Sequence, residues 1–181
     1  LDCLPQEMPG SGVGDYRDDC IRLWHSDGSM AADFRYVGYE ILAGSYRIPG
    51  LPALHDSEEE QGQTLVITLK EVASQVMVCL YYGVFEAENV ITRAVRVENQ
   101  GKEDVILDEC LSCCLDFQFG DLDMVTFAGR HAMERGPERN PVGRTRLEVG
   151  SVRGTSSHQY NPAVILCSPQ ATEDFGDCYG M

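Results

Sequence analysis

The chain has 181 residues, 43% of them hydrophobic, which is enough for one domain with a complete core. Its 29 acidic and 14 basic residues give a formal net charge of −15 at pH 7. Binding to nucleic acid or to an anionic membrane surface requires clustered Lys and Arg, so this charge argues against both kinds of partner. A neutral ligand such as a sugar is compatible with it.

Alternation of apolar and polar residues predicts strands along most of the chain. The first is expected at residues 20–24, and the Asp-Gly pair in the following turn favours a tight hairpin that returns at residues 32–42. The later expected strands are residues 64–70, 75–85, 89–98, 104–117, 124–127, 144–153 and 163–168, and the expected Gly/Pro-rich loops are residues 49–52 and 136–143. The pattern predicts an all-β, antiparallel two-sheet β-sandwich that forms a single domain over residues 1–181.

The eight cysteines are too few for a disulfide-dense scaffold, so we interpret them as reduced thiols of a cytoplasmic protein. Cys110, Cys113 and Cys114 have the spacing of half a zinc site. On an extended strand, however, Cys110 and Cys113 point to opposite faces, and Cys110 and Cys114 lie ~13 Å apart. We therefore expect neither a metal site nor a cofactor.

Two groups of polar residues have the residue types of catalysis without its spacing. The Ser-Ser-His run at 156–158 is contiguous, and neighbours on an extended chain do not converge as a nucleophile and its base. Asp116, Asp121 and Asp123 fit neither a calcium loop nor an obvious pair of glycosidase carboxylates. We therefore expect neither group to be catalytic.

Two segments near the N-terminus combine a carboxylate, an aromatic ring and a guanidinium: Asp15-Tyr16-Arg17 and Asp33-Phe34-Arg35-Tyr36. An aromatic face can stack on the apolar face of a pyranose, and the charged groups can bind its hydroxyls. Ordinary salt bridges at strand ends are the alternative explanation.

A polar segment at residues 153–162 stands directly before the apolar run 163–167. A surface loop has no need of so many directed donors and acceptors side by side, so this segment is expected to dock against another surface. The residues expected to make the contact are Arg153, Ser156, Ser157, His158, Gln159 and Asn161.

These motifs, in this order, resemble the N-terminal domain of bacterial α-galactosidases of glycoside hydrolase family 36. The similar motifs are Asp15-Tyr16-Arg17, Asp33-Phe34-Arg35-Tyr36, Gly50-Leu51-Pro52-Ala53, Val90-Ile91-Thr92-Arg93, Leu115-Asp116-Phe117, Glu134-Arg135 and the segment 153–162. The resemblance covers nearly the whole chain, and the segment 153–162 is its most distinctive part.

The resemblance implies a β-supersandwich similar to galactose mutarotase, followed in the parent protein by a central (β/α)8 barrel. In this family the barrel carries both catalytic aspartates. The barrel would lie beyond Gly180, so the chain is expected to be a non-catalytic fragment that ends before it. The parent protein is expected to be an α-galactosidase that removes terminal α-galactosyl residues from oligosaccharides such as raffinose or melibiose.

The resemblance also implies a homo-oligomer, expected to be a tetramer, in which this domain packs on its own barrel through the segment 156–159. Asp15, Tyr16 and Arg17, with Arg35 in support, are expected to approach the sugar pocket of a neighbouring subunit. The alternative function is a free-standing carbohydrate-binding β-sandwich, which the single Trp disfavours.

Overall fold

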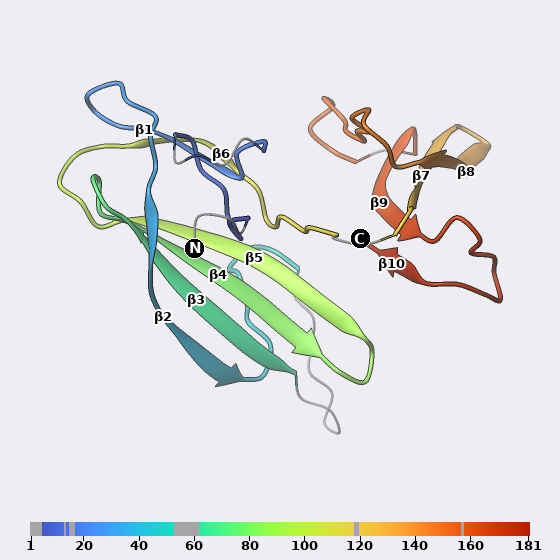
Figure 1. Cartoon of the computed structure of the whole chain (residues 1–181), viewed down its shortest axis with the longest axis horizontal. Coiled ribbons are helices and arrows are strands. Elements are labelled where there is room, and N and C mark those ends of the chain that lie inside the picture. The colour runs from blue at the N-terminus through green and yellow to red at the C-terminus, as the bar shows by residue number, and fades with distance from the viewer. Residues whose placement is uncertain (1–4, 13, 15–16, 53–61, 118–119, 157) are drawn as a thin grey trace. The chain divides into compact units, whose positions relative to one another are not determined.

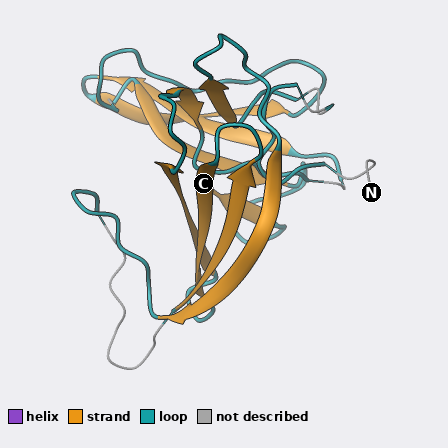
Figure 2. Ribbon diagram, turned by 90° about the vertical axis from the view of Figure 1, so that its left-hand side faces the viewer, coloured by secondary structure: helices purple, strands orange, loops and turns teal. Residues whose placement is uncertain are grey.

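The computed structural model describes residues 5–12, 14, 17–52, 62–117, 120–156 and 158–181. Within these ranges the chain forms ten strands and no helix, so none of them offers a helix that could cross a membrane (Figures 1 and 2). Every pair of neighbouring strands is antiparallel. The all-β antiparallel prediction is confirmed. The chain divides into two compact units, Leu1–Asp116 and Phe117–Met181.

The first unit contains a four-stranded sheet and a two-stranded sheet. The larger sheet has the order β2-β3-β4-β5, with β2 (Phe34–Ala43), β3 (Gln63–Glu71), β4 (Val76–Phe85) and β5 (Val90–Asn99). The smaller sheet pairs β1 (Ile21–Trp24) with β6 (Ile106–Cys110). Figure 1 shows β2 to β5 side by side, with β1 and β6 over one face of this sheet.

The core of this unit lies between its two sheets. Val76, Val78 and Leu80 of β4 are completely buried, and they cluster with Ile21 and Leu23 of β1. Alternate residues of a strand share a face, so the apolar alternation in β4 places all three side chains in the core. Full burial of such a side chain contributes about 1.5–3 kcal/mol.

The predicted hairpin between the first two strands is wrong. The turn itself forms: the His25 N–H donates to the Ser29 carbonyl oxygen at 2.9 Å, and Gly28 has a φ of 83°. The strands after it separate, however: β1 pairs with β6, and β2 pairs with β3. Ala32 lies in the segment that connects the two sheets. It is buried, and its N–H donates to the Ser11 carbonyl oxygen at 2.9 Å.

The strand predicted over residues 104–117 is shorter than expected, because β6 ends at Cys110. The next backbone bond, from the Leu111 N–H to the Cys20 carbonyl oxygen at 2.7 Å, is the last along this edge before the chain becomes irregular. Cys113 and Cys114 therefore lie outside any strand, and Cys114 packs against the core. The expectation that Cys110 and Cys113 point to opposite faces of one strand is therefore wrong. Among the described residues, no group of three His, Cys, Asp or Glu side chains could hold a metal ion.

The second unit is a four-stranded sheet with the order β10-β9-β7-β8. Its strands are β7 (Asp123–Arg130), β8 (Met133–Pro141), β9 (Tyr160–Cys167) and β10 (Cys178–Gly180). The predicted loop at 136–143 is largely strand β8, since an edge strand tolerates the Gly and Pro residues that suggested a loop. The predicted strand at 144–153 does not form, and nearly all of its residues are exposed.

Two outer strands of the larger sheets, β8 and β2, differ in the residues that they expose. Strand β8 is exposed along all nine residues, two of them proline. Strand β2 exposes Tyr36, Val37, Tyr39 and Ile41, each by more than half of its surface.

Candidate functional site

Arg17 is held inside the first unit by contacts from three directions. Its Nη1 lies 2.6 Å from Asp116 Oδ2 and 3.4 Å from Cys114 Sγ, and its Nη2 donates to the Gln6 carbonyl oxygen at 2.7 Å. These contacts join the N-terminal segment to the chain that follows β6. Asp15 and Tyr16, the other members of this predicted sugar-binding motif, lie outside the described residues.

Arg35 has a different set of contacts. Its Nε and Nη2 donate to Asp33 Oδ2 at 3.0 and 2.6 Å, and its side chain is exposed on the edge strand β2. The Asp33 N–H in turn donates to Glu71 Oε1 at 3.4 Å. Arg17 therefore contacts Asp116 and Cys114, whereas Arg35 contacts Asp33.

The predicted docking segment is an exposed loop that leads into β9. Arg153, Ser156 and His158 are exposed, Gln159 is half-buried, and Ser157 lies outside the described residues. Asn161 stands at the start of β9, where its Oδ1 accepts a hydrogen bond from the Ala163 N–H at 3.0 Å.

This loop surrounds a surface hollow of about 410 Å³ that includes Ser156, Tyr160 and Pro162 in its lining. Val152 beside it is fully exposed. The Glu134-Arg135 motif lies on β8, where hydrogen bonds from the backbone N–H groups of Ala132 and of Glu134 itself lower the pKa of Glu134.

A third motif, Gly50-Leu51-Pro52, forms part of a loop over the larger sheet of the first unit. Hydrogen bonds from the Gly44 N–H to the Gly62 carbonyl oxygen and from Thr64 Oγ1 to the Gly44 carbonyl oxygen, both 2.8 Å, close the base of this loop. The Leu51 N–H donates to the Ile48 carbonyl oxygen at 3.1 Å, and Gly50 has a φ of 82°. Pro and Gly at the two central positions are those that a type II turn requires.

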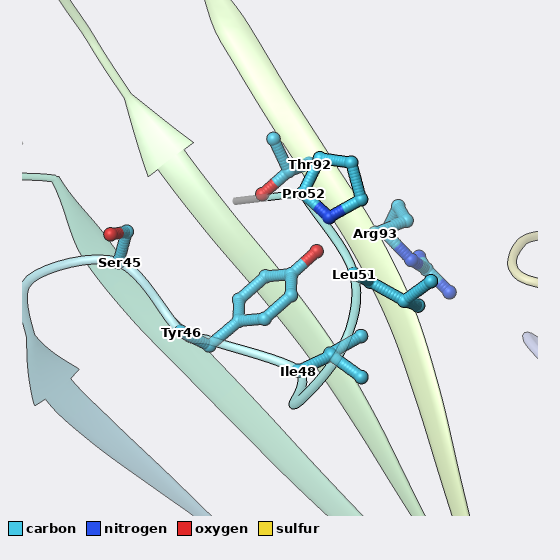
Figure 3. A pocket seen from close by; sticks show the side chains of 7 residues that line it. All are labelled: Ser45, Tyr46, Ile48, Leu51, Pro52, Thr92 and Arg93. Atoms are coloured by element: carbon cyan, nitrogen blue, oxygen red, sulfur yellow. The ribbon is translucent and has the colours of Figure 1, made fainter. Parts of the chain in front are cut away.

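The loop encloses a pocket of about 420 Å³ against β5 (Figure 3). Its lining residues are Ser45, Tyr46, Ile48, Leu51, Pro52, Thr92 and Arg93. The Tyr46 ring lies 5.3 Å from the Tyr81 ring of β4, and its hydroxyl points toward Pro52 and Thr92. The pocket therefore combines an apolar wall with hydroxyl groups.

Arg93 closes one side of this pocket and continues into the interior of the unit. Its guanidinium lies 3.7 Å from the centre of the Tyr82 ring, and its Nη1 donates to Glu7 Oε1 at 2.7 Å. The Tyr82 hydroxyl donates to the same oxygen. Burial is the larger cause that raises the pKa of Tyr82, and the hydrogen bond to Glu7 is the second. Arg93 Nε and Nη2 are buried without a hydrogen-bond partner among the described residues.

This pocket is not predicted from the sequence, although both motifs that build it are recognisable there. The Gly-Leu-Pro loop and the Ile-Thr-Arg stretch of β5 are about forty residues apart, and only the fold of β2 to β5 brings them together. Of the three aspartates considered as carboxylate candidates, Asp116 pairs with Arg17 and Asp123 with Arg139, both at 2.6 Å, and Asp121 is exposed.

A family model described as the glycosyl hydrolase family 36 N-terminal domain matches residues 1–181. Over 181 residues the chain is 48% identical to the bifunctional alpha-galactosidase/sucrose kinase AgaSK of Mediterraneibacter gnavus, a match that covers 100% of this chain and 19% of that protein. It is 38% identical to alpha-galactosidase AgaA of Geobacillus stearothermophilus, with 100% of this chain and 25% of that protein covered. The chain thus spans about a fifth to a quarter of the length of these relatives.

Solved structures show the same similarity. The galactosidase domain of AgaSK superposes with a TM-score of 0.92 at 48% identity, covering 99% of this chain and 25% of that chain. A variant of AgaA from Geobacillus stearothermophilus in complex with raffinose superposes with a TM-score of 0.93 at 38% identity, again covering 99% and 25%.

Proposed function

Because the chain belongs to the N-terminal domain family of glycoside hydrolase family 36, we propose that its parent protein is an α-galactosidase that hydrolyses terminal α-galactosyl residues of oligosaccharides. The observation that carries this proposal is the family match over all of residues 1–181, together with relatives named as α-galactosidases. The raffinose in one similar structure supports an α-galactosylated oligosaccharide as the substrate class.

Within that protein the chain has a supporting role. Retaining hydrolysis needs two carboxyl groups about 5 Å apart on either side of the scissile bond. Asp116 and Asp123 are each engaged with an arginine, which leaves them poorly suited to that chemistry. The remainder of the protein supplies the catalytic groups, and this domain packs on it and contributes to a homo-oligomer.

The activity is tested by comparing the full-length protein with the 181-residue chain. The full-length protein should release nitrophenol from a nitrophenyl α-galactoside and galactose from raffinose, whereas the chain alone should release neither. Release of nitrophenol or galactose by the purified 181-residue chain alone would refute the supporting role. A full-length protein that binds α-galactosides without hydrolysing them would instead favour a carbohydrate-binding module.

Arg17 is proposed to act at the sugar pocket of a neighbouring subunit, with Arg35 in support. A charged hydrogen bond contributes about 1.5–3 kcal/mol, so Arg17→Ala should lower kcat/KM of the full-length protein roughly tenfold to a hundredfold. The ion pair with Asp116 is partly exposed and contributes about 1 kcal/mol at most.

Asp116→Asn is the matched control, since it removes the same ion pair and keeps the guanidinium. It should leave kcat/KM within about fivefold of wild type, because ~1 kcal/mol corresponds to about fivefold in rate. Equal melting temperatures and equal kcat/KM values for the two variants would make Arg17 a purely structural residue.

The segment 153–161 is proposed to dock against the catalytic part of the protein. Val152 offers the sharpest test because it is fully exposed in this chain. Val152→Asp should leave the melting temperature of the 181-residue chain unchanged and lower that of the full-length protein, where the charge would be buried at the contact. An unchanged melting temperature in both proteins would place the docking surface elsewhere.

A further inference from the structure

Two cysteines of the second unit lie directly opposite each other on neighbouring strands. In the register of β9 and β10, Cys167 pairs with Cys178, Leu166 with Tyr179 and Ile165 with Gly180. Figure 1 shows the two strands side by side. Side chains that are directly opposite in an antiparallel pair project from the same face of the sheet, so both thiols lie on one face.

The backbone hydrogen bonds on either side of Cys167 and Cys178 show whether this is a hydrogen-bonded or a non-hydrogen-bonded pair. Val164 and Met181 exchange two backbone bonds of 2.9 and 2.7 Å, and the Ser168 N–H donates to the Asp177 carbonyl oxygen at 3.0 Å. Bonded and non-bonded pairs alternate along an antiparallel ladder, so Cys167 and Cys178 occupy a non-hydrogen-bonded pair. The Cα atoms of such a pair are about 4.5 Å apart, within the range that a disulfide spans.

Local structure holds this register. The turn between the two cysteines is closed by bonds from the Ala171 N–H to the Ser168 carbonyl oxygen at 2.9 Å and from the Thr172 N–H to the Phe175 carbonyl oxygen at 2.7 Å. Arg139 of β8 adds three more bonds, to the carbonyl oxygens of residues 168, 169 and 171, at 2.8, 2.9 and 2.9 Å. The backbone therefore holds Cys167 and Cys178 directly opposite each other.

We propose that Cys167 and Cys178 are a redox-sensitive pair, which a small-molecule disulfide oxidises to a cross-strand disulfide that ties β10 to β9. Cys178 is exposed and Cys167 is buried, so the two sulfurs have different roles. The Cys178 thiolate attacks one sulfur of the small disulfide and expels a small thiolate. The Cys167 thiolate then attacks the Cys178 sulfur of the mixed disulfide and expels the second thiolate.

The balance of this exchange is complete. Cys167 and Cys178 lose two electrons and two protons between them, and the small disulfide becomes two thiols. Burial raises the pKa of Cys167, while the charge of the neighbouring Arg139 guanidinium opposes that rise. The exposed thiol therefore reacts first, and the buried thiol completes the exchange from a fixed position.

The test uses the full-length protein, reduced and then incubated with glutathione disulfide. Trypsin leaves Cys167 and Cys178 on one peptide, since no Lys or Arg lies between them, whereas cleavage after Glu173 separates them. The oxidised peptide should lack two hydrogen atoms, resist alkylation at both cysteines, and remain as two linked fragments after cleavage at Glu173 until it is reduced. Alkylation of both cysteines should fall together as glutathione disulfide rises.

Cys178→Ser should abolish the link, and because Cys178 is exposed this variant keeps the fold. Cys110→Ser is the matched control: Cys110 is also exposed at a strand end, but its register partner is Ile21. It should leave the Cys167–Cys178 link intact. Glutathione retained on Cys178, a bond from Cys178 to another chain, or a link between other cysteines in its place would each overturn the proposal.

Discussion

Glu71 is a buried carboxylate that fastens the turn between β3 and β4, and its charge should be worth a measurable part of the stability of the first unit. Its Oε2 accepts bonds from Ser74 Oγ at 2.7 Å and from the Ser74 N–H at 2.5 Å. Its Oε1 accepts from the Asp33 N–H at 3.4 Å, which links the turn to the start of β2. Glu71→Gln keeps the shape and removes the charge.

The size of the effect follows from the two short bonds. A hydrogen bond to a charged group contributes about 1.5–3 kcal/mol and a neutral one about 0.5–1.5 kcal/mol, so each bond loses roughly 1 kcal/mol. Glu71→Gln should therefore destabilise the unit by about 2 kcal/mol at pH 7. With a denaturant slope of about 2 kcal/mol per molar urea, the unfolding midpoint falls by about 1 M.

The loss should depend on pH with a defined sign. Burial disfavours the charged form of Glu71, but the bonds from Ser74 and the neighbouring backbone outweigh it and lower the pKa below its ordinary value of 4.5. A lowered pKa means that the stabilisation is present above the ordinary value and is lost as the pH falls through the folded-state pKa. The difference between wild type and Glu71→Gln should be full at pH 7 and shrink at pH values below 4.5.

Urea unfolding followed by the fluorescence of Trp24, the single tryptophan and a residue of β1, reports on this unit alone. Glu40→Gln is the matched control, because Glu40 is exposed on β2, and it should shift the midpoint by less than about 0.3 M, as surface changes do. A loss for Glu71→Gln that is the same at pH 7 and pH 4, or no larger than that of the control, would show that the charge of Glu71 does not stabilise the unit.

Three further predictions concern backbone packing, the Arg139 contacts and the exposed loop. Gly101→Ala would place a Cβ 2.1 Å from the Ser74 carbonyl oxygen, so the urea midpoint read by Trp24 should fall by at least about 1 M. Arg139→Lys cannot reproduce three directed bonds, and amide exchange in residues 168–177 should accelerate roughly tenfold, whereas unchanged exchange would show the turn to be self-supporting. Val152→Asp in the 181-residue chain should leave the free energy of unfolding within about 0.5 kcal/mol of wild type by urea titration.

The sequence predicts a strand well where the alternating apolar side chains are the ones that enter the core. In β4, Val76, Val78 and Leu80 alternate because each must enter the same core. The pairing of strands carries no such local signal. The Asp-Gly turn after β1 is formed as predicted, yet the strand that follows it joins the other sheet, because the burial of Ala32 and the register of β3 decide the partner.

The missed elements have equally physical causes. Strand β8 contains residue types that are common in loops, and it is extended because it pairs with the outer side of β7. Of the candidate site, the exposure of the docking segment agrees with its polar sequence. The pocket beneath Gly50-Leu51-Pro52 could not be foreseen, since Tyr46 and Thr92 meet only across folded strands.

Two of the outer strands, β8 and β2, have opposite consequences for the behaviour of the chain in isolation. Strand β8 cannot readily recruit a further strand, because Pro137 and Pro141 lack the N–H that a new ladder needs and Glu138 carries charge. Strand β2 contains no proline, and Tyr39 and Ile41 present apolar surface along this outer strand. The chain should therefore aggregate through β2 once salt screens its net charge of −15, and a lysine introduced by Tyr39→Lys should keep it in solution.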